Sequence, residues 1–238
     1  MSSRGAKRRG ICTSRLILLA LLAVVVSCDV STRIGGTAPF REYRVVNAYT
    51  SPVDILVDGN VVAAALTPGD MFNGTITLGT HTLALRSTGS STPITQPLIG
   101  AVAPPSTIAA VRASTGALSS AVLDDTNTVV DANATKVRVL HLAPNAAPLQ
   151  IYRTQPDVHT PVAWLGSPLS YEPNPTSQNI QYVASTVGGW EIRAWQSPAD
   201  SSGWDTAPAK VLFLLPGGQK ATVLILDKAG GGVRLLVI

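Results

Sequence analysis

The sequence has few cysteines, and it has no acidic residue near its start. Its 238 residues include two cysteines, Cys12 and Cys28, and the first acidic residue is Asp29. If Cys12 is removed with a leader and Cys28 is modified, the folded part has no cysteine for a disulfide bond or a thiolate metal site. We therefore expect its stability to come from the burial of apolar side chains.

A long apolar run is also missing. The run that follows the basic first residues extends from Leu16 to Val26 and contains 11 residues, whereas a helix that crosses a bilayer needs about 20. A basic start, a short apolar middle and a small residue at the end, here Ser27, are typical of a secretory signal. Residues 1–27 are therefore predicted to be a cleaved signal peptide.

A basic surface for nucleic acid is missing as well. The formal charge is +4, from 18 basic and 14 acidic residues. Five of the basic residues lie within residues 1–27, so the remaining chain has 13 basic and 14 acidic residues, which are not clustered. Nucleic-acid binding requires basic side chains gathered on a folded face. We therefore expect no nucleic-acid partner.

The leader does contain a specific cleavage pattern. Val25-Val26-Ser27-Cys28 resembles the bacterial lipobox, in which a peptidase cuts directly before the cysteine. The resemblance implies cleavage between Ser27 and Cys28, a diacylglycerol on the Cys28 sulfur, and an exported lipoprotein that faces the periplasm or the cell surface. Two alternatives stay open here, an ordinary signal peptide with a chance cysteine and an anchor that is not cleaved. Asp29 resembles an inner-membrane retention signal, but the choice between inner and outer membrane also stays open.

The rest of the chain has the composition of an all-β protein, with 17 prolines, 20 glycines and many valines and threonines. Residues 28–41 are polar and glycine-rich, and they are predicted to form a flexible tether. Short β runs and turn signals follow, and Asp58-Gly59-Asn60 between two such runs predicts a hairpin. The expected strands include residues 44–49, 53–57, 61–66, 80–86, 107–113 and 117–123.

An internal repeat organises the β region. Residues 44–56 match residues 138–152, and the turn within this stretch is two residues shorter in the first copy. Residues 78–83 match residues 187–192. We therefore predict an all-β protein with two tandem immunoglobulin-like antiparallel β-sandwich domains, at residues 42–123 and 136–238, and a linker at residues 124–135. The oxygen-rich linker is interpreted as a solvated turn region, because it lacks the ordered spacing of a calcium loop.

The openings of the two copies resemble a known family. The run Val137-Arg138-Val139-Leu140-His141-Leu142-Ala143-Pro144-Asn145-Ala146-Ala147-Pro148 is similar to the V-R-V-x-H-A-S-P-D-A-P-like opening of the domain of unknown function 4397 family. The first copy instead keeps the V-D-V-Y-V-D-G continuation of that family, as Val53-Asp54-Ile55-Leu56-Val57-Asp58-Gly59. The resemblance covers nearly all of residues 42–238. It implies secreted or surface-anchored β-sandwich modules, often in tandem, and no particular activity.

Residues that carry catalysis are scarce. The sequence has three histidines and no G-x-S-x-G, H-E-x-x-H or phosphate-binding glycine pattern. His141 lies on the apolar face of its strand and is predicted to be a hydrogen-bonded core or turn histidine, and His81 is predicted to pack because Trp190 replaces it in the second copy. His159 lies in a loop next to proline. We expect a non-enzymatic binding or structural module of the bacterial envelope, without cofactor or metal. The alternative is an envelope hydrolase whose site is assembled from residues distant in sequence.

The tryptophans are unevenly distributed, since all four lie in the second copy. Strand alternation places Trp190 on the core face and Trp195 on the opposite, polar face, beside Arg193. An exposed tryptophan next to charged residues can stack on a sugar or a protein side chain. Trp195 and Trp204 are therefore candidate contacts for a protein or glycan ligand. The alternatives for Trp195 are covering a loop and stacking on Arg193.

Overall fold

The structure, a computed structural model, describes residues 40–95, 106–123, 132–160, 162–173, 182–195 and 209–238. These ranges contain β-strands and no α-helix, so the prediction of an all-β protein is confirmed. Accordingly, no helix within the described ranges has the length and apolar character needed to cross a membrane. The strands all belong to one compact unit, Pro39–Ile238.

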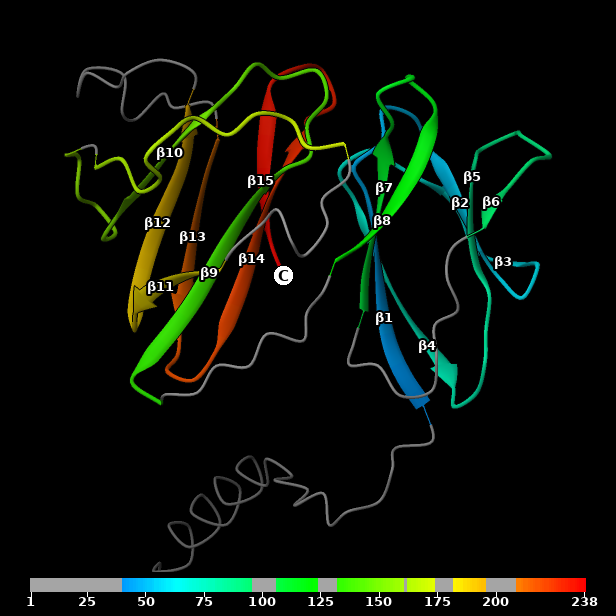
Figure 1. Cartoon of the computed structure of the whole chain (residues 1–238), viewed down its shortest axis with the longest axis horizontal. Helices are drawn as coiled ribbons and strands as arrows, with labels where there is room; N and C mark the ends of the chain where they lie inside the picture. Colours follow the sequence, from blue (N-terminus) through cyan, green and yellow to red (C-terminus); the bar gives the residue numbers. More distant parts are fainter. Residues whose placement is uncertain (1–39, 96–105, 124–131, 161, 174–181, 196–208) are drawn as a thin grey trace, which may run out of the picture. The chain divides into compact units, whose positions relative to one another are not determined.

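The first repeat contains eight strands, which Figure 1 labels. Their bounds are β1 Phe40–Asn47, β2 Val53–Val57, β3 Asn60–Leu66, β4 Met71–Thr77, β5 Leu83–Ser87, β6 Ile94–Thr95, β7 Ser106–Arg112 and β8 Leu118–Leu123. They form one sheet in the order β4-β1-β7-β8 and a second in the order β3-β2-β5-β6. The predicted hairpin between β2 and β3 is confirmed, since Asp58 and Gly59 have φ values of 50° and 79° and form its turn.

The second repeat contains the remaining described strands. Their bounds are β9 Ala134–His141, β10 Gln150–Thr154, β11 Val183–Thr186, β12 Gly188–Trp195, β13 Ala209–Leu215, β14 Lys220–Asp227 and β15 Val233–Val237. They form one sheet in the order β11-β9-β14-β15 and a second in the order β10-β12-β13. The first of these sheets has the same strand order as β4-β1-β7-β8, so the topology repeats along with the sequence.

The register of the strands also follows the sequence repeat. In the first repeat, Asp54 on β2 lies opposite Arg86 on β5. In the second, Gln150 on β10 lies opposite Trp195 on β12. These are the partners that the sequence alignment of the two copies places at equivalent positions. Residues of one repeat can therefore be compared with their counterparts in the other position by position.

The prediction of purely antiparallel sheets is wrong for one pair of strands in each repeat. β1 runs parallel to β7, and β9 runs parallel to β14. A parallel pair needs a long connection between its strands. Here the intervening chain supplies that length, because it builds strands of the opposite sheet before it returns. The other pairs of described strands are antiparallel.

Two predicted boundaries need a small correction. β1 begins at Phe40, so the last two residues of the predicted tether already belong to a strand. β9 begins at Ala134, so the last two residues of the predicted linker also belong to a strand. Residues 124–131 of the linker and residues 1–39 lie outside the described ranges. In both cases the strand extends because its neighbour, β4 or β11, continues the pairing.

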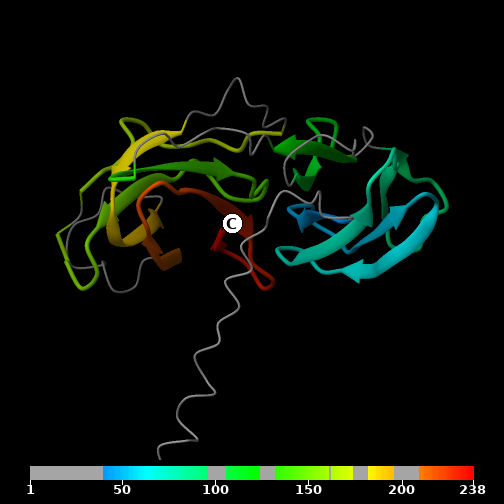
Figure 2. The ribbon, with the colours of Figure 1, turned by 90° about the horizontal axis from the view of Figure 1, so that it is seen from below.

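Figure 2 shows the twisted sheets of each repeat. Each repeat has its own apolar core between its two sheets. The core of the first repeat includes Val45, Ile55, Leu85 and Ile108. The core of the second includes Val139, Ile151, Ile192 and Val223. In both cores the side chains come from every second residue of facing strands, as expected for a sandwich.

A third apolar cluster joins the two repeats. It consists of residues on the other faces of the sheets β4-β1-β7-β8 and β11-β9-β14-β15. Val46 pairs with Ala109 across β1 and β7, and the equivalent pair Leu140 and Leu224 lies across β9 and β14. All four side chains belong to this cluster and are 0% or 1% exposed. Because the same positions of both repeats meet, the interface is isologous, like that of a twofold dimer.

Candidate functional site

His141 clamps the turn that follows β9. It is 2% exposed, and its Nδ1 accepts a hydrogen bond of 3.3 Å from the backbone N–H of Ala143. The proton must then be on Nε2, which donates to the carbonyl of Ala147 at 3.3 Å. Burial lowers the pKa of His141 from its usual value of 6.5. The predicted role as a hydrogen-bonded turn histidine is confirmed.

Asn47 performs the same task in the first repeat. Its Oδ1 accepts from the N–H of Tyr49 at 2.9 Å, and its Nδ2 donates to the carbonyl of Ser51 at 3.0 Å. The longer imidazole therefore accompanies the turn that is two residues longer. This pairing explains the histidine of the V-R-V-x-H opening as a structural residue.

His81 lies at the centre of a chain of polar contacts beside the β2–β3 hairpin. Its Nδ1 is 2.6 Å from Oδ2 of Asp58, and its Nε2 is 3.2 Å from Oγ1 of Thr77. If Nδ1 donates to the carboxylate, Nε2 accepts from the threonine hydroxyl. The hydrogen bond from His81, more than that from the N–H of Thr82, lowers the pKa of Asp58. The prediction that His81 packs did not include these contacts, through which it takes part in an acid–imidazole–hydroxyl chain.

The equivalent corner of the second repeat holds an arginine between two indole rings. Trp190, which replaces His81, packs against the core as predicted, and its Nε1 donates to the carbonyl of Thr186 at 2.9 Å. The guanidinium of Arg153 lies 4.4 Å from the centre of the Trp190 ring and 5.0 Å from that of Trp164. Burial lowers the pKa of Arg153. Sequence reasoning missed this stack, because Trp164 lies in a segment without a counterpart in the first repeat.

Of the two predicted ligand tryptophans, Trp195 lies within the described ranges. Trp195 is half-buried at the end of β12, opposite Gln150. Its face of β12 is not an open polar surface as predicted, since Glu191 and Arg193 are 8% and 2% exposed and form a buried ion pair. Two oppositely charged groups can share such a position because each neutralises the other.

Several predicted residues lie away from any described site. Trp204, Ser27 and Cys28 lie outside the described ranges. His159 is exposed in the segment between β10 and β11. Among the described residues, no three His, Cys, Asp or Glu side chains are grouped in a way that could hold a metal ion.

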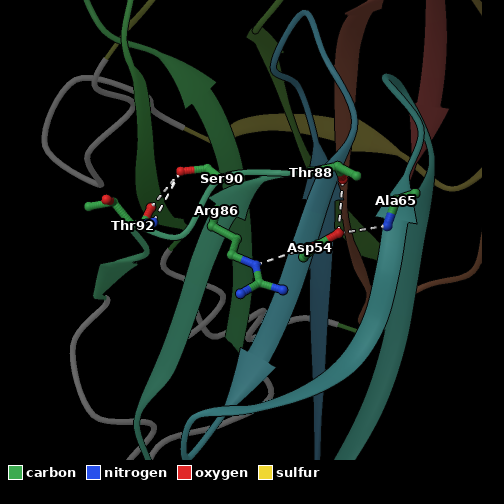
Figure 3. Close-up of polar contacts among 6 residues, drawn as sticks. All are labelled: Asp54, Ala65, Arg86, Thr88, Ser90 and Thr92. Atoms are coloured by element: carbon green, nitrogen blue, oxygen red, sulfur yellow. Dashed lines mark hydrogen bonds and ion pairs between the residues drawn. The ribbon is translucent and has the colours of Figure 1, made fainter.

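Asp54 connects three strands of the first repeat through hydrogen bonds, as Figure 3 shows. This buried carboxylate accepts hydrogen bonds from the N–H of Ala65 at 3.0 Å, from Nε of Arg86 at 2.9 Å and from the hydroxyl of Thr88 at 2.9 Å. The Ala65 N–H contributes most to lowering the pKa of Asp54, ahead of the two side chains. Asp54 is therefore a structural residue. In the same view, the N–H of Thr92 donates to the hydroxyl of Ser90 at 3.1 Å.

Polar contacts flank the apolar interface between the repeats. The hydroxyl of Tyr171 accepts a hydrogen bond of 3.1 Å from the N–H of Arg112 and donates to the carbonyl of the same residue. Arg234 donates to Oδ1 of Asp70 at 3.1 Å. A Cβ atom at Gly69, whose φ is 86°, would lie 2.7 Å from Nε of Arg234. The positive φ favours glycine at this position, and a larger residue would push the arginine side chain aside.

A groove of about 560 Å³ lies beside this contact. The first repeat contributes the loop between β3 and β4, and the second contributes the start of β13 and the β14–β15 hairpin. Its lining includes Pro68, Lys210, Asp227, Lys228, Val233 and Arg234. This combination of apolar walls and charged side chains can hold a ligand that is partly apolar and partly charged. The groove was not predicted, because no sequence pattern indicates which loops of the two repeats meet.

Comparison with known proteins addresses the resemblance noted in the sequence. Residues 42–152 match the family model described as Domain of unknown function (DUF4397). The DUF4397 match begins within β1 and ends within β10, so it includes the first repeat and the opening strands of the second. It therefore supports the family that the openings of the two copies indicated. No curated protein matches the chain.

One solved structure that the chain matches is the Bacillus anthracis TIE protein. The identity to it is 8% and the TM-score is 0.23. The match covers 79% of this chain and 34% of that chain. This chain therefore spans about a third of the length of the TIE protein.

Proposed function

We propose that the protein is an exported bacterial lipoprotein that is cleaved before Cys28 and anchored to a membrane of the cell envelope by lipid on that cysteine. Its two repeats are tandem, immunoglobulin-like modules of the DUF4397 type that act in binding or as a structural element, without catalysis. The lipobox-like Val25-Val26-Ser27-Cys28 supports the anchor. The repeated strand order supports the tandem arrangement.

The observation that carries the proposal is the isologous interface between the repeats. Outer sheet faces bearing Leu140, Leu224 and Val46 are covered by each other, so that residues 39–238 form one compact unit directly after the tether. A compact unit on a lipidated tether suits display at a membrane surface. The groove at the same boundary, which needs residues of both repeats, supports binding over a purely structural role.

Mass spectrometry of the protein from membranes tests the anchor. We expect a mature chain that starts at Cys28 and carries a diacylglycerol, whose two acyl chains would anchor it firmly where a single chain anchors only marginally. The Cys28→Ala variant should have the mass of the uncleaved, unmodified precursor. A wild-type chain with an unmodified amino terminus at another residue would contradict the proposal.

A second candidate function, an envelope hydrolase, is favoured by the Asp58–His81–Thr77 chain alone. In that function, the Thr77 hydroxyl would attack an acyl carbon while Nε2 of His81 takes its proton and Asp58 orients the ring. The chain is open to solvent, since the Asp58 side chain is 49% exposed. This exposure favours the non-enzymatic role, because acyl transfer relies on a site that excludes water.

Hydrolysis of p-nitrophenyl acetate separates the two functions. We expect the wild type, His81→Ala and Thr77→Val to hydrolyse this ester at the same slow background rate, because neither His81 nor Thr77 acts in catalysis. General-base catalysis by His81 would instead make His81→Ala slower by about 100-fold or more. A drop of that size in both variants would establish the hydrolase and refute the non-enzymatic role.

A further inference from the structure

The two sides of the isologous interface differ at the residue that precedes a shared backbone hydrogen bond. In the second repeat, the N–H of Glu172 donates to the carbonyl of His141 at 3.0 Å, and in the first, the N–H of Gly69 donates to the carbonyl of Asn47 at 2.6 Å. Since Asn47 and His141 are equivalent, the residues before these donors are equivalent too. Tyr171 of the second repeat therefore corresponds to Pro68 of the first.

Tyr171 reaches across the interface and fills the space at its end. Its hydroxyl binds both backbone groups of Arg112, and its ring packs edge-on to that of His141, with 6.5 Å between ring centres. The residue equivalent to Arg112 is Asp227, since the register places Thr107 and Thr222 at equivalent positions opposite Arg44 and Arg138. A tyrosine in place of Pro68 would thus reach toward Asp227.

The space beside Pro68 is part of the groove described above. Both Pro68 and Asp227 line it, and the short proline ring leaves open a space that corresponds to the one filled by the Tyr171 side chain. The lining also contains Val233, which is 4% exposed, and Leu235, which is partly buried. The groove therefore has the position and the apolar walls to accept a phenol ring from another molecule.

The charges around the groove indicate what should flank such a ring. Lys210 and Lys228 are exposed on its rim. Thr67 and Arg234 both donate hydrogen bonds to the Asp70 carboxylate. These contacts lower the pKa of Asp70, and the hydrogen bond from the Thr67 hydroxyl contributes more than that from Arg234. The Asp227 carboxylate accepts a hydrogen bond of 2.8 Å from Nδ2 of Asn145. Since both acids already have partners, the two lysines favour a ligand with carboxylates.

We propose that this groove binds an extended peptide segment in which a tyrosine is flanked by acidic residues. The tyrosine ring takes the place beside Asp227 that Tyr171 takes beside Arg112, and the acidic residues contact Lys210 and Lys228. The inference deepens the proposed function, because it rests on the chain being a binding module and names the chemistry of its partner.

Three short peptides test the proposal on the mature lipidated chain in detergent micelles. The probes are acetyl-Asp-Tyr-Asp-amide, acetyl-Lys-Tyr-Lys-amide and acetyl-Asp-Ala-Asp-amide, and their binding is measured by ligand-detected NMR. We expect the first peptide to bind at least about tenfold more tightly than the other two, because only it matches both the walls and the rim. Equal affinities for the three, or no binding of the first, would overturn the proposal.

Variants of the protein test whether the peptide binds in the groove. Pro68→Tyr supplies the ring from the protein itself, and we expect it to weaken binding of acetyl-Asp-Tyr-Asp-amide by about tenfold. Pro93→Tyr, at an exposed proline that does not line the groove, is the matched control and should bind like the wild type. Lys228→Glu leaves the walls intact and should give a similar loss through the rim alone. Wild-type affinity in both Pro68→Tyr and Lys228→Glu would place the peptide elsewhere and refute the groove.

The experiments distinguish a wrong peptide-binding proposal from a wrong lipid-anchor proposal. The mass of the mature amino terminus reports on Cys28 and does not depend on the groove. Peptide binding by the folded repeats likewise does not depend on the lipid, and it can be repeated with a Cys28→Ser chain that starts at residue 28. A lipidated chain that ignores all three peptides would remove the groove and leave the lipoprotein assignment in place.

Discussion

Replacing Leu224 by aspartate should uncouple the two repeats and divide one cooperative unfolding transition into two. Leu224 lies on β14 within the cluster that joins the repeats, and it is fully buried. An unpaired carboxylate at this position would be removed from water without a partner, which costs more than about 4 kcal/mol. The interface would open in preference, because each repeat keeps a separate core of its own.

Differential scanning calorimetry and urea unfolding measure this effect. The wild type should unfold in a single transition, and Leu224→Asp should show two, with the first at a lower temperature. Leu224→Ala should lower the free energy of unfolding by about 3 kcal/mol without introducing a charge. Leu212→Asp is the matched control, because Leu212 on β13 is 63% exposed, and a surface change of this kind costs about 0.5 kcal/mol or less. A single transition at the wild-type midpoint in Leu224→Asp would contradict the proposed role of the interface.

A part of this interface could be predicted from the sequence. Residues Val223 to Leu226 form an uninterrupted apolar run, and such a run is typical of a strand that is covered on both faces. The same holds for Leu140 and Leu142, which lie on the face opposite Val139. The run predicts that something covers the outer face. It does not predict that the partner is the same face of the other repeat, because many arrangements would satisfy the same burial.

The repeat itself was the strongest sequence signal, because equivalent positions keep equivalent tasks. Asn47 and His141 have different side chains but bind the same two points of the turn backbone. Where equivalent residues of the two repeats differ in chemistry, comparing them does not predict the contacts that each of them makes. The exchange of His81 for Trp190 correctly suggested a packed position, yet the contacts of His81 with Asp58 and Thr77 depend on the exposed hairpin of the first repeat.

The candidate site was less accessible to prediction than the fold. A tryptophan pair around Arg153 forms because Trp164, in a segment unique to the second repeat, folds back onto β10 and donates its backbone N–H to the carbonyl of Ile151 at 2.8 Å. Similarly, the groove exists because Pro68 stands where its counterpart is Tyr171. Both features depend on loops, whose sequences carry no period from which contacts could be derived.

The second large effect is expected on the free energy of unfolding when His141 is replaced. Asn47, which has the same role in the first repeat, indicates which replacement should cost less. His141→Ala removes an acceptor and a donor from a buried turn and leaves the N–H of Ala143 and the carbonyl of Ala147 without that partner. We expect a loss of about 3 kcal/mol in the free energy of unfolding. His141→Asn should lose only about 1 kcal/mol, because the first repeat performs the same task with asparagine. Urea unfolding at neutral pH measures both values. Equal losses in the two variants would contradict the role of His141 in hydrogen-bonding the turn.

The pH dependence of the same variants provides a sharper test. Burial holds the pKa of His141 below its usual value of 6.5, so the unfolded chain binds this proton more readily than the folded chain does. The free energy of unfolding should therefore be unaffected by His141 above pH 6.5 and should decrease as the pH falls below that value. Burial raises the pKa of the nearby Asp227, which acts in the opposite direction, but this residue is present in both proteins. Subtracting the pH profile of His141→Asn from that of the wild type therefore isolates the histidine, and a flat difference between about pH 5 and pH 8 would show that His141 is not held neutral by burial.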